Sequence, residues 1–352
     1  MKKKQWIVGL VVLAALVALL VWGRDRMHFD FRAFGSQLAL ADWRKIAFAL
    51  GCIYVCYVIR SVRWALLLRH IKKVGPFSLL GTQVIGFTAV ALIGRIADPV
   101  RPYLVAKKPG LPLSNQFAVY IVERLFDAVS MVLIFCTVIL ATPADQLPHA
   151  EILRKASFTG LLVTVAGALF LFAVRLMGNG IATFFEDAFS VVSKGLGHAV
   201  GEKIRTFRTG LDTLRTPADF AITMGVSLVM WVLIALAYLE VTTAFVASPE
   251  LKGLTLAKCM LLMASGMAAS SLQLPIIGWF TQIGLVEEAM RNFFGVAPEA
   301  ATACAATLLL VSFLSIAPIG LVWARFEHVS LRKIAKESEQ AGETLAAEEP
   351  AG

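Results

Sequence analysis

Apolar segments long enough to cross a lipid bilayer recur along this chain, at residues 6–22, 46–59, 117–141, 157–174, 220–247, 256–273 and 299–323. The hydrocarbon core of a bilayer is about 30 Å thick, and a helix needs about 20 mostly apolar residues to span it. A backbone exposed to lipid has to satisfy its own hydrogen bonds, which a helix does within each segment. We therefore expect an all-α, polytopic membrane protein.

Composition agrees with this fold class. Hydrophobic residues make up 58% of the 352 residues and charged residues 16%, whereas soluble domains contain about 45–50% apolar and about 25% charged residues. The longest hydrophilic pieces, 175–217 and the end of the chain, are each shorter than the ~50 residues of an independent domain. We expect one transmembrane domain at 1–323 and a cytoplasmic, largely disordered tail at 324–352.

The distribution of basic residues predicts the orientation. Short loops rich in lysine and arginine stay in the cytoplasm, and such loops follow the second apolar run, fill 175–217 and begin the tail. The first of them carries Arg60, Arg63, Arg69, Lys72 and Lys73. The first apolar run lies between Trp6 and Trp22, which favours an uncleaved anchor over a secretory signal. Both termini are then cytoplasmic, in a multi-pass protein of the cell (cytoplasmic) membrane.

The formal charge of +9 fits this orientation and an attraction to anionic lipid headgroups. Nucleic acid is not an expected partner, because the basic residues fall in separate inner loops and form no stripe on a folded domain. The expected partners are membrane lipids, anionic or phosphate-bearing. A homo-oligomer or a partner protein in envelope biosynthesis stays an open alternative.

The stretch GRIADPVRP, residues 94–102, directly follows an apolar run and interrupts it. If residues 77–93 crossed the membrane completely, Arg95 and Arg101 would lie outside and the next crossing would run in the wrong direction. We therefore expect residues 77–102 to enter from the cytoplasm, break and return, as a re-entrant segment beside about eight crossings.

Two prolines argue against the alternative interpretation of this stretch, a snorkelling interfacial loop. Pro99 and Pro102 break a helix and expose backbone groups that lipid cannot satisfy. Irregular backbone at membrane depth is tolerated where it lines a wet cavity. We therefore favour a functional site here, with helix-break or gating positions at Gly94, Pro99 and Pro102.

Three charged residues lie inside the apolar run FAVYIVERLFDAVSMVLIF: Glu123, Arg124 and Asp127. Each costs about 2.5–3.5 kcal/mol at the centre of a membrane helix if it is unpaired. On a helix, Glu123 and Asp127 share one face, and Arg124 can reach Asp127 at a spacing of three residues. The spacing favours a substrate or coupling site, because ionisable residues inside membranes are functional by default. The alternative is an internal ion pair that only locks two helices together.

A second interruption lies in the C-terminal half, in GMAASSLQLPIIGWFTQIGLVEEAM, and we expect a broken segment at 273–294. The interrupting residues are Pro275, Gly278 and Gly284. Interrupted apolar segments in both halves of a chain point to a transporter binding site. Pseudo-symmetric halves are a hypothesis that a structure would refute if 77–127 and 256–291 lay far apart.

The five cysteines all fall inside apolar runs, and neither a C-x-x-C pair nor a suitably spaced histidine accompanies them. We expect them to be small core residues, and we expect no metal site and no cofactor.

The segment GRIADPVRPYLVAKKPGLPLSNQFAVYIVERLFD resembles the membrane domain of the lysylphosphatidylglycerol synthase/flippase family, which also includes stand-alone flippase-like proteins. The residues that match the family pattern are Gly94, Arg95, Arg101, Pro102, Lys107, Lys108, Glu123, Arg124 and Asp127. Ala97 and Asp98 stand where Gly-Glu is usual, so the carboxylate is one carbon shorter. A later Pro/Gly-rich turn with Gln282 looks like the second family motif with fewer glycines.

This resemblance implies a flippase-like protein that translocates a phosphate-bearing lipid: an aminoacyl-phospholipid, another phospholipid or a polyprenyl phosphate. The expected headgroup-binding residues are Arg95, Asp98, Arg101, Glu123, Arg124, Asp127 and Gln282. The arginines are the phosphate ligands. The acids balance those arginines, contact a cationic or sugar group, or take up a proton.

Two-domain members of the family carry a soluble aminoacyl-transferase domain after the membrane part. For this chain we expect the translocating half without the synthase half, and therefore no enzyme activity. Two alternatives stay open: an intramembrane lipid-modifying transferase, and a non-catalytic scaffold of an envelope-assembly complex.

Overall fold

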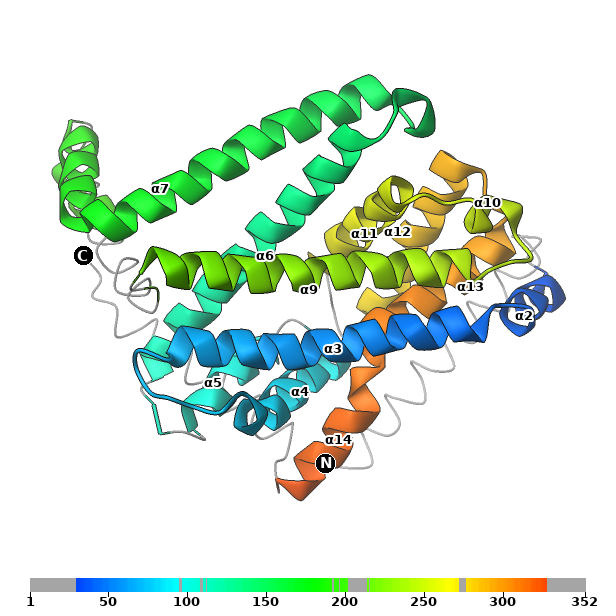
Figure 1. Ribbon diagram of the computed structural model, residues 1–352, viewed down its shortest axis with the longest axis horizontal. Helices are drawn as coiled ribbons and strands as arrows, with labels where there is room; N and C mark the ends of the chain where they lie inside the picture. The colour runs from blue at the N-terminus through cyan, green and yellow to red at the C-terminus, as the bar shows by residue number, and fades with distance from the viewer. Residues whose placement is uncertain are drawn as a thin grey trace.

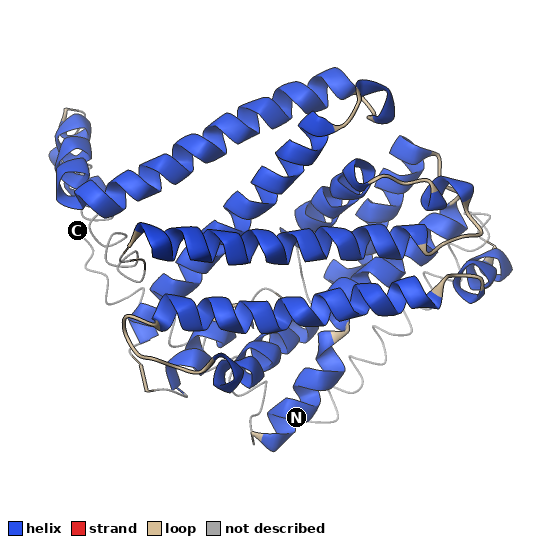
Figure 2. Ribbon diagram, viewed as in Figure 1, coloured by secondary structure: helices blue, strands red, loops and turns tan. Residues whose placement is uncertain are grey.

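The computed structural model describes residues 30–94, 97–107, 110–111, 113–191, 193–195, 197–201, 214, 216–271 and 277–327. These residues form helices and connecting turns, with no β-strand among them (Figure 2). The expected all-α class is therefore confirmed. The apolar run at 6–22 and the tail beyond residue 327 lie outside the described residues.

The first half of the described chain contains α2 (Phe31–Ala39), α3 (Trp43–Leu68), α4 (Pro76–Ile93), α5 (Val100–Lys107), α6 (Leu113–Ala141), the short 3-10 helix η2 (Ala144–Gln146) and α7 (Ala150–Ser190). The second half contains α9 (Pro217–Thr243), α10 (Pro249–Lys252), α11 (Leu256–Ser271), α12 (Ile277–Phe294), α13 (Pro298–Leu309), the π-helical turn η4 (Leu310–Leu314) and α14 (Ile316–Phe326).

Six stretches of the described residues are helical, long enough and apolar enough to cross a membrane: Trp43–Leu68, Pro76–Ile93, Gln116–Ala141, Ala150–Leu169, Pro217–Thr243 and Pro298–Phe326. Leu256–Ser270 is a shorter apolar helix. The expected total of about eight crossings includes the run at 6–22, which is not described, so that total stays a prediction. The helices establish a polytopic architecture.

Two of the boundaries expected from the sequence were wrong. The second apolar run was expected to end at residue 59, but α3 continues to Leu68 and contains Arg60 and Arg63. The run at 157–174 was expected to pass into a hydrophilic connector, but α7 continues to Ser190. In both cases apolar side chains recur at helical spacing beyond the charged residues, so the helix continues.

Helices α3 and α9 run side by side along the molecule (Figure 1). At the C-terminal end of α3, polar contacts also join it to α9. Asp219 lies in the first turn of α9 and closes a capping box with Thr216. The Asp219 carboxylate also pairs with Arg69 and lies 2.9 Å from the His70 ring nitrogen Nε2, just beyond the end of α3. The C-terminal end of α3 and the N-terminal end of α9 therefore lie together.

Helices α4 and α5 are two arms of an interrupted segment. Gly94 ends α4 with φ of 90°, a conformation that glycine adopts without strain. Pro99 lies in the turn before α5. Pro102 was expected to break a helix as well, but it lies in the first turn of α5, where a helix tolerates proline. The arms approach closely at Gly86, where an added Cβ would come within 3.3 Å of the Arg101 Cα. Re-entry of this segment into a membrane stays a prediction.

Helices α11 and α12 pack against each other as the arms of the second interrupted segment. Pro275 lies outside the described residues. Gly278 and Gly284 were expected to interrupt a helix, but both lie within the continuous helix α12, Gly278 buried in its first turn and Gly284 facing open space. The Trp279 indole Nε1 donates to the Ala91 carbonyl oxygen at 3.1 Å, near the end of α4. Segments 77–127 and 256–291 are thus in contact, and the condition that would refute pseudo-symmetric halves is not met. The symmetry itself stays a prediction.

Helix α14 packs against α4 through a glycine. A Cβ added at Gly320 would overlap the Thr88 side chain and would lie 3.0 Å from the Val84 carbonyl oxygen. Thr88 also donates to the Ile316 carbonyl oxygen at 3.2 Å. Only a residue without a side chain fits between these two helices.

We predict that Gly320→Leu lowers the free energy of unfolding by about 1–3 kcal/mol, the usual cost of overpacking a close contact. The matched control is Gly225→Leu on α9, because Gly225 has no neighbouring atom within 4 Å. Thermal unfolding of the detergent-purified variants measures the difference. Equal melting temperatures for the two variants would contradict the close packing of α4 and α14.

Candidate functional site

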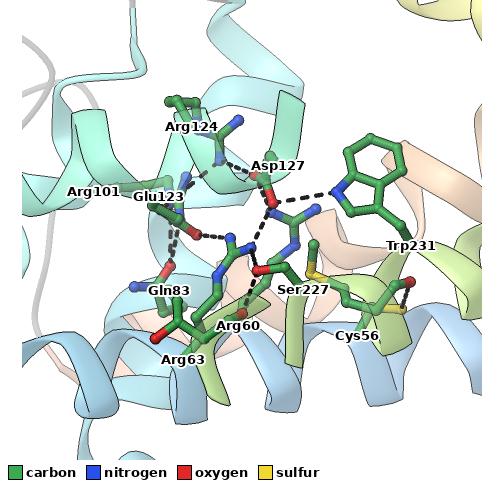
Figure 3. A network of polar contacts seen from close by, with 12 residues as sticks. Cys56, Arg60, Arg63, Gln83, Arg101, Glu123, Arg124, Asp127, Ser227 and Trp231 are labelled. Carbon is green, nitrogen blue, oxygen red and sulfur yellow. Dashed lines mark hydrogen bonds and ion pairs between the residues drawn. The ribbon is translucent and has the colours of Figure 1, made fainter. Parts of the chain in front are cut away.

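The described part of the chain gathers six charged side chains from three helices inside the bundle (Figure 3). We call this group the arginine cluster; its members are Arg60, Arg63, Arg101, Glu123, Arg124 and Asp127. Glu123 is ten residues beyond Leu113, where α6 begins, or about 15 Å along the helix at 1.5 Å per residue. Glu123 also lies inside Gln116–Ala141, a stretch long and apolar enough to cross a membrane.

Arg63 connects both carboxylates. Its Nη1 donates to Asp127 Oδ1 at 2.6 Å and to the Ser227 hydroxyl at 2.9 Å, while its Nη2 donates to Glu123 Oε1 at 2.7 Å. The Arg63 side chain is 0% exposed. The Trp231 indole donates to Asp127 Oδ1 at 3.4 Å from the α9 side. One guanidinium group therefore joins α3, α6 and α9.

Arg101 approaches Glu123 from the broken segment. Its Nη2 lies 2.9 Å from Glu123 Oε1 and 2.8 Å from Oε2, and the same group donates to the Gln83 amide oxygen at 2.9 Å. The Arg101 Cζ lies 4.1 Å from the centre of the Phe87 ring and 5.2 Å from that of Trp64. Aromatic faces stabilise a guanidinium group that has left water.

Arg60 and Arg124 form the outer edge of the cluster. Arg124 Nη2 lies 3.3 Å from Asp127 Oδ2, the pairing at three residues that the sequence predicted, and its side chain is 41% exposed. Arg60 Nη1 lies 3.6 Å from the same oxygen and is 13% exposed. Guanidinium groups present several donors in one plane and bind carboxylate or phosphate through two oxygens. The cluster can therefore bind an oxyanion from its outer edge.

The structure brings together four of the expected headgroup-binding residues and separates others. Arg101, Glu123, Arg124 and Asp127 meet in the arginine cluster. Asp98 lies on the turn before α5, partly exposed and close enough to Tyr120 to interact electrostatically. Gln282 is 8% exposed, its amide nitrogen lies beside Gly266 on α11, and among the described residues it forms no hydrogen bond to the cluster. Arg95 lies outside the described residues.

Sequence reasoning missed Arg60 and Arg63 as members of this group, because it assigned both to a cytoplasmic loop. A signal was present: residues 52–74 contain neither glycine nor proline, and apolar residues flank both arginines. This pattern favours a continuous helix and places the arginines within it. Gln83, Ser227 and Trp231 carried no comparable signal, since single polar or aromatic residues are common inside membrane helices.

The five cysteines are buried and free, as expected for small core residues. Cys56, for example, donates from its thiol to the Met230 carbonyl oxygen at 3.5 Å. Within the described residues, no group of histidine, cysteine, aspartate and glutamate side chains is arranged to hold a metal ion.

Comparison with known proteins now identifies the family. The family model described as the lysylphosphatidylglycerol synthase TM region matches residues 6–335. The chain belongs to this family. The match covers nearly the whole chain and confirms the resemblance found in the motifs around Gly94 and Glu123. No curated protein and no solved structure matches the chain. The protein is thus a multi-pass membrane protein of the lysylphosphatidylglycerol synthase TM family.

We predict that Arg63→Ala destabilises the protein by about 3–5 kcal/mol, because it leaves the Glu123 and Asp127 carboxylates with less compensation inside the bundle. Arg291→Ala is the control, since Arg291 is 45% exposed and pairs with Glu287 on the surface of α12. Exposed pairs contribute about 0–1 kcal/mol. Chemical unfolding in detergent measures both variants, and similar losses would show that the Arg63 contacts carry no special stability.

Proposed function

We propose that this protein translocates a phosphate-bearing lipid across the cytoplasmic membrane and binds the headgroup at the arginine cluster. Both termini are cytoplasmic in this proposal. The observation that carries it is the arginine cluster itself, which includes residues of a helix long and apolar enough to cross a membrane and lies beside an interrupted helix. The lipid is an aminoacyl-phospholipid, another phospholipid or a polyprenyl phosphate.

A phosphate headgroup is expensive to move through hydrocarbon, because an ionised group loses its hydration there. A translocator lowers this cost by replacing water with fixed cations and hydrogen-bond donors. Arg101 and Arg124 supply such donors, one in the interior and one at the outer edge of the cluster. A phosphate can therefore exchange its hydration for guanidinium contacts while its acyl chains stay in lipid.

In this proposal, the carboxylates stabilise the arginines when no lipid is bound. Glu123 holds Arg63 and Arg101, and Asp127 holds Arg60, Arg63 and Arg124. Buried arginines without these counterions would repel each other and destabilise the bundle. A phosphate that binds Arg101 or Arg124 competes with these internal contacts, so the carboxylates keep the site intact between transport cycles.

The interrupted segments support a binding site whose helices rearrange during transport. Transporters commonly build their binding sites from discontinuous helices, because the ends of the half-helices face the substrate and contact its charged groups. Here α5 carries Arg101, and the start of α12 contacts the end of α4 through Trp279 and Ala91. A rearrangement of either arm would reach the other through this contact.

We predict that the reconstituted protein moves a phosphate-bearing lipid between the leaflets of liposomes, and that Arg101→Ala and Glu123→Gln each slow the movement at least about tenfold. A hydrogen bond to a charged group contributes about 1.5–3 kcal/mol, and 1.4 kcal/mol corresponds to tenfold. The assay follows headgroup accessibility of fluorescent phospholipids and of a polyprenyl phosphate. Arg291→Gln serves as the control at matched incorporation.

Three results would contradict this proposal. Movement that survives both substitutions would place the headgroup elsewhere. A native protein that moves none of these lipids would refute translocation of the classes named here. If the substitutions lower the cellular abundance of the protein and impair the envelope to the same degree, with no loss per molecule, the result would favour a non-catalytic scaffold.

A further inference from the structure

The arginine cluster contains more positive charge than its own carboxylates neutralise. Arg60, Arg63, Arg101 and Arg124 contribute four positive charges, and guanidinium groups stay protonated in proteins. Their ion pairs within the described residues run to Glu123 and Asp127, which contribute two negative charges and leave +2. Asp98, the nearest further acid along the chain, is partly exposed and interacts electrostatically with Tyr120, whose ring lies beside Arg101 and Arg124. Among the described residues, Asp98 forms no ion pair with these arginines.

The hydrogen bonds of the cluster show the same imbalance. Several buried nitrogen atoms in and beside the cluster have no hydrogen-bond partner among the described residues: Arg63 Nε, Gln83 Nε2, Arg101 Nη1 and Arg124 Nε. Arg60 Nη1 and Arg124 Nη2 form no hydrogen bond either, although they lie 3.6 and 3.3 Å from Asp127 Oδ2 as ion pairs. All of them are donors. The carboxylate oxygens of Glu123 and Asp127 are absent from this group. The Arg101 side chain is 1% exposed and Gln83 is 0% exposed, so bulk water does not reach them.

A buried donor without an acceptor destabilises the protein, and a charged donor does so more strongly than a neutral one. The cluster therefore lacks acceptor oxygens and negative charge at the same place. These are two separate observations, since a charge excess could exist with every donor satisfied. A ligand that corrects both deficits has to be an oxyanion with a charge near −2.

We propose that the arginine cluster selects a phosphate monoester, the doubly charged terminal phosphate, over a phosphodiester headgroup. This inference rests on the proposed function and specifies its substrate class. A phosphate monoester carries about −1.5 to −2 charges at pH 7 and has three strong acceptor oxygens. A phosphodiester supplies one charge and fewer free oxygens, and a cationic aminoacyl group adds to the positive excess.

The position of Arg124 favours a lipid-borne phosphate over free phosphate in solution. Arg124 is three residues from Ile121 and four from Ala128, and both of these residues are exposed on α6. Residues at this spacing share one face of a helix. The exposed edge of Arg124 thus shares an apolar face that is suited to lipid, so a headgroup can reach the cluster laterally while its chains remain in the bilayer.

The test is equilibrium binding to the full-length protein in detergent at pH 8, measured by calorimetry. The probes are dioctanoyl phosphatidic acid, dioctanoyl phosphatidylglycerol, a lysyl ester of the latter, and inorganic phosphate. We expect the monoester lipid to bind at least about tenfold more tightly than the diester, which is about 1.4 kcal/mol. Arg124→Gln weakens monoester binding, and the exposed Arg291→Gln does not.

The pH dependence provides a readout that needs no variant. The second proton of a phosphate monoester binds near pH 6, and the group then loses one negative charge. Monoester affinity should therefore fall as the pH is lowered from 8 to 5, while diester affinity stays constant. A structural role of the cluster would produce no such difference between the two lipids.

Equal or tighter binding of the diester, or of the lysyl ester, would overturn the selectivity even if translocation and its loss in Arg101→Ala are observed. Inorganic phosphate that binds as tightly as phosphatidic acid would overturn the lipid-borne form of the ligand. Tight, pH-dependent monoester binding without any translocation would support this ligand class and contradict the proposed function instead.

Discussion

The ion pairs of Arg63 with Glu123 and Asp127 are the interaction on which the rest of this structure depends. Arg63 is fully buried and also donates to Ser227, so one guanidinium group connects α3, α6 and α9. Without this partner, the two buried carboxylates would be too costly to ionise. Their ionised oxygens are what Arg60, Arg101 and Arg124 then bind. The central helices and the candidate site are therefore held together by the same contacts.

The interruption between α4 and α5 has a direct consequence for this site. Arg101 comes eighteen residues after Gln83, and a continuous helix would separate them by about 27 Å at 1.5 Å per residue. Because the chain turns after Gly94, the Arg101 guanidinium instead donates to the Gln83 amide oxygen at 2.9 Å. Gly86 permits this approach, since a side chain there would meet Arg101. The helix break thus places the second interior arginine beside Glu123.

Structural and binding roles are compatible in such a cluster. The carboxylates hold the arginines in place, but two negative charges leave the four cations incompletely neutralised. Stability alone would favour an equal number of acids, or apolar side chains of similar volume. The anionic ligand proposed above would account for this excess of buried donors. Arg124, whose side chain is 41% exposed, is where the proposed ligand would first contact the cluster.

The sequence by itself determined the helical membrane class, the family, the break near Gly94 and the pairing of Arg124 with Asp127. These features follow from local spacing: apolar runs set helix length, glycine and proline end helices, and residues three or four apart share a face. Only the tertiary structure decided that Arg63 joins both carboxylates, that Arg101 lies against Phe87, and that Gln282 lies elsewhere. Those contacts join residues far apart in the chain, and their geometry depends on how the helices pack.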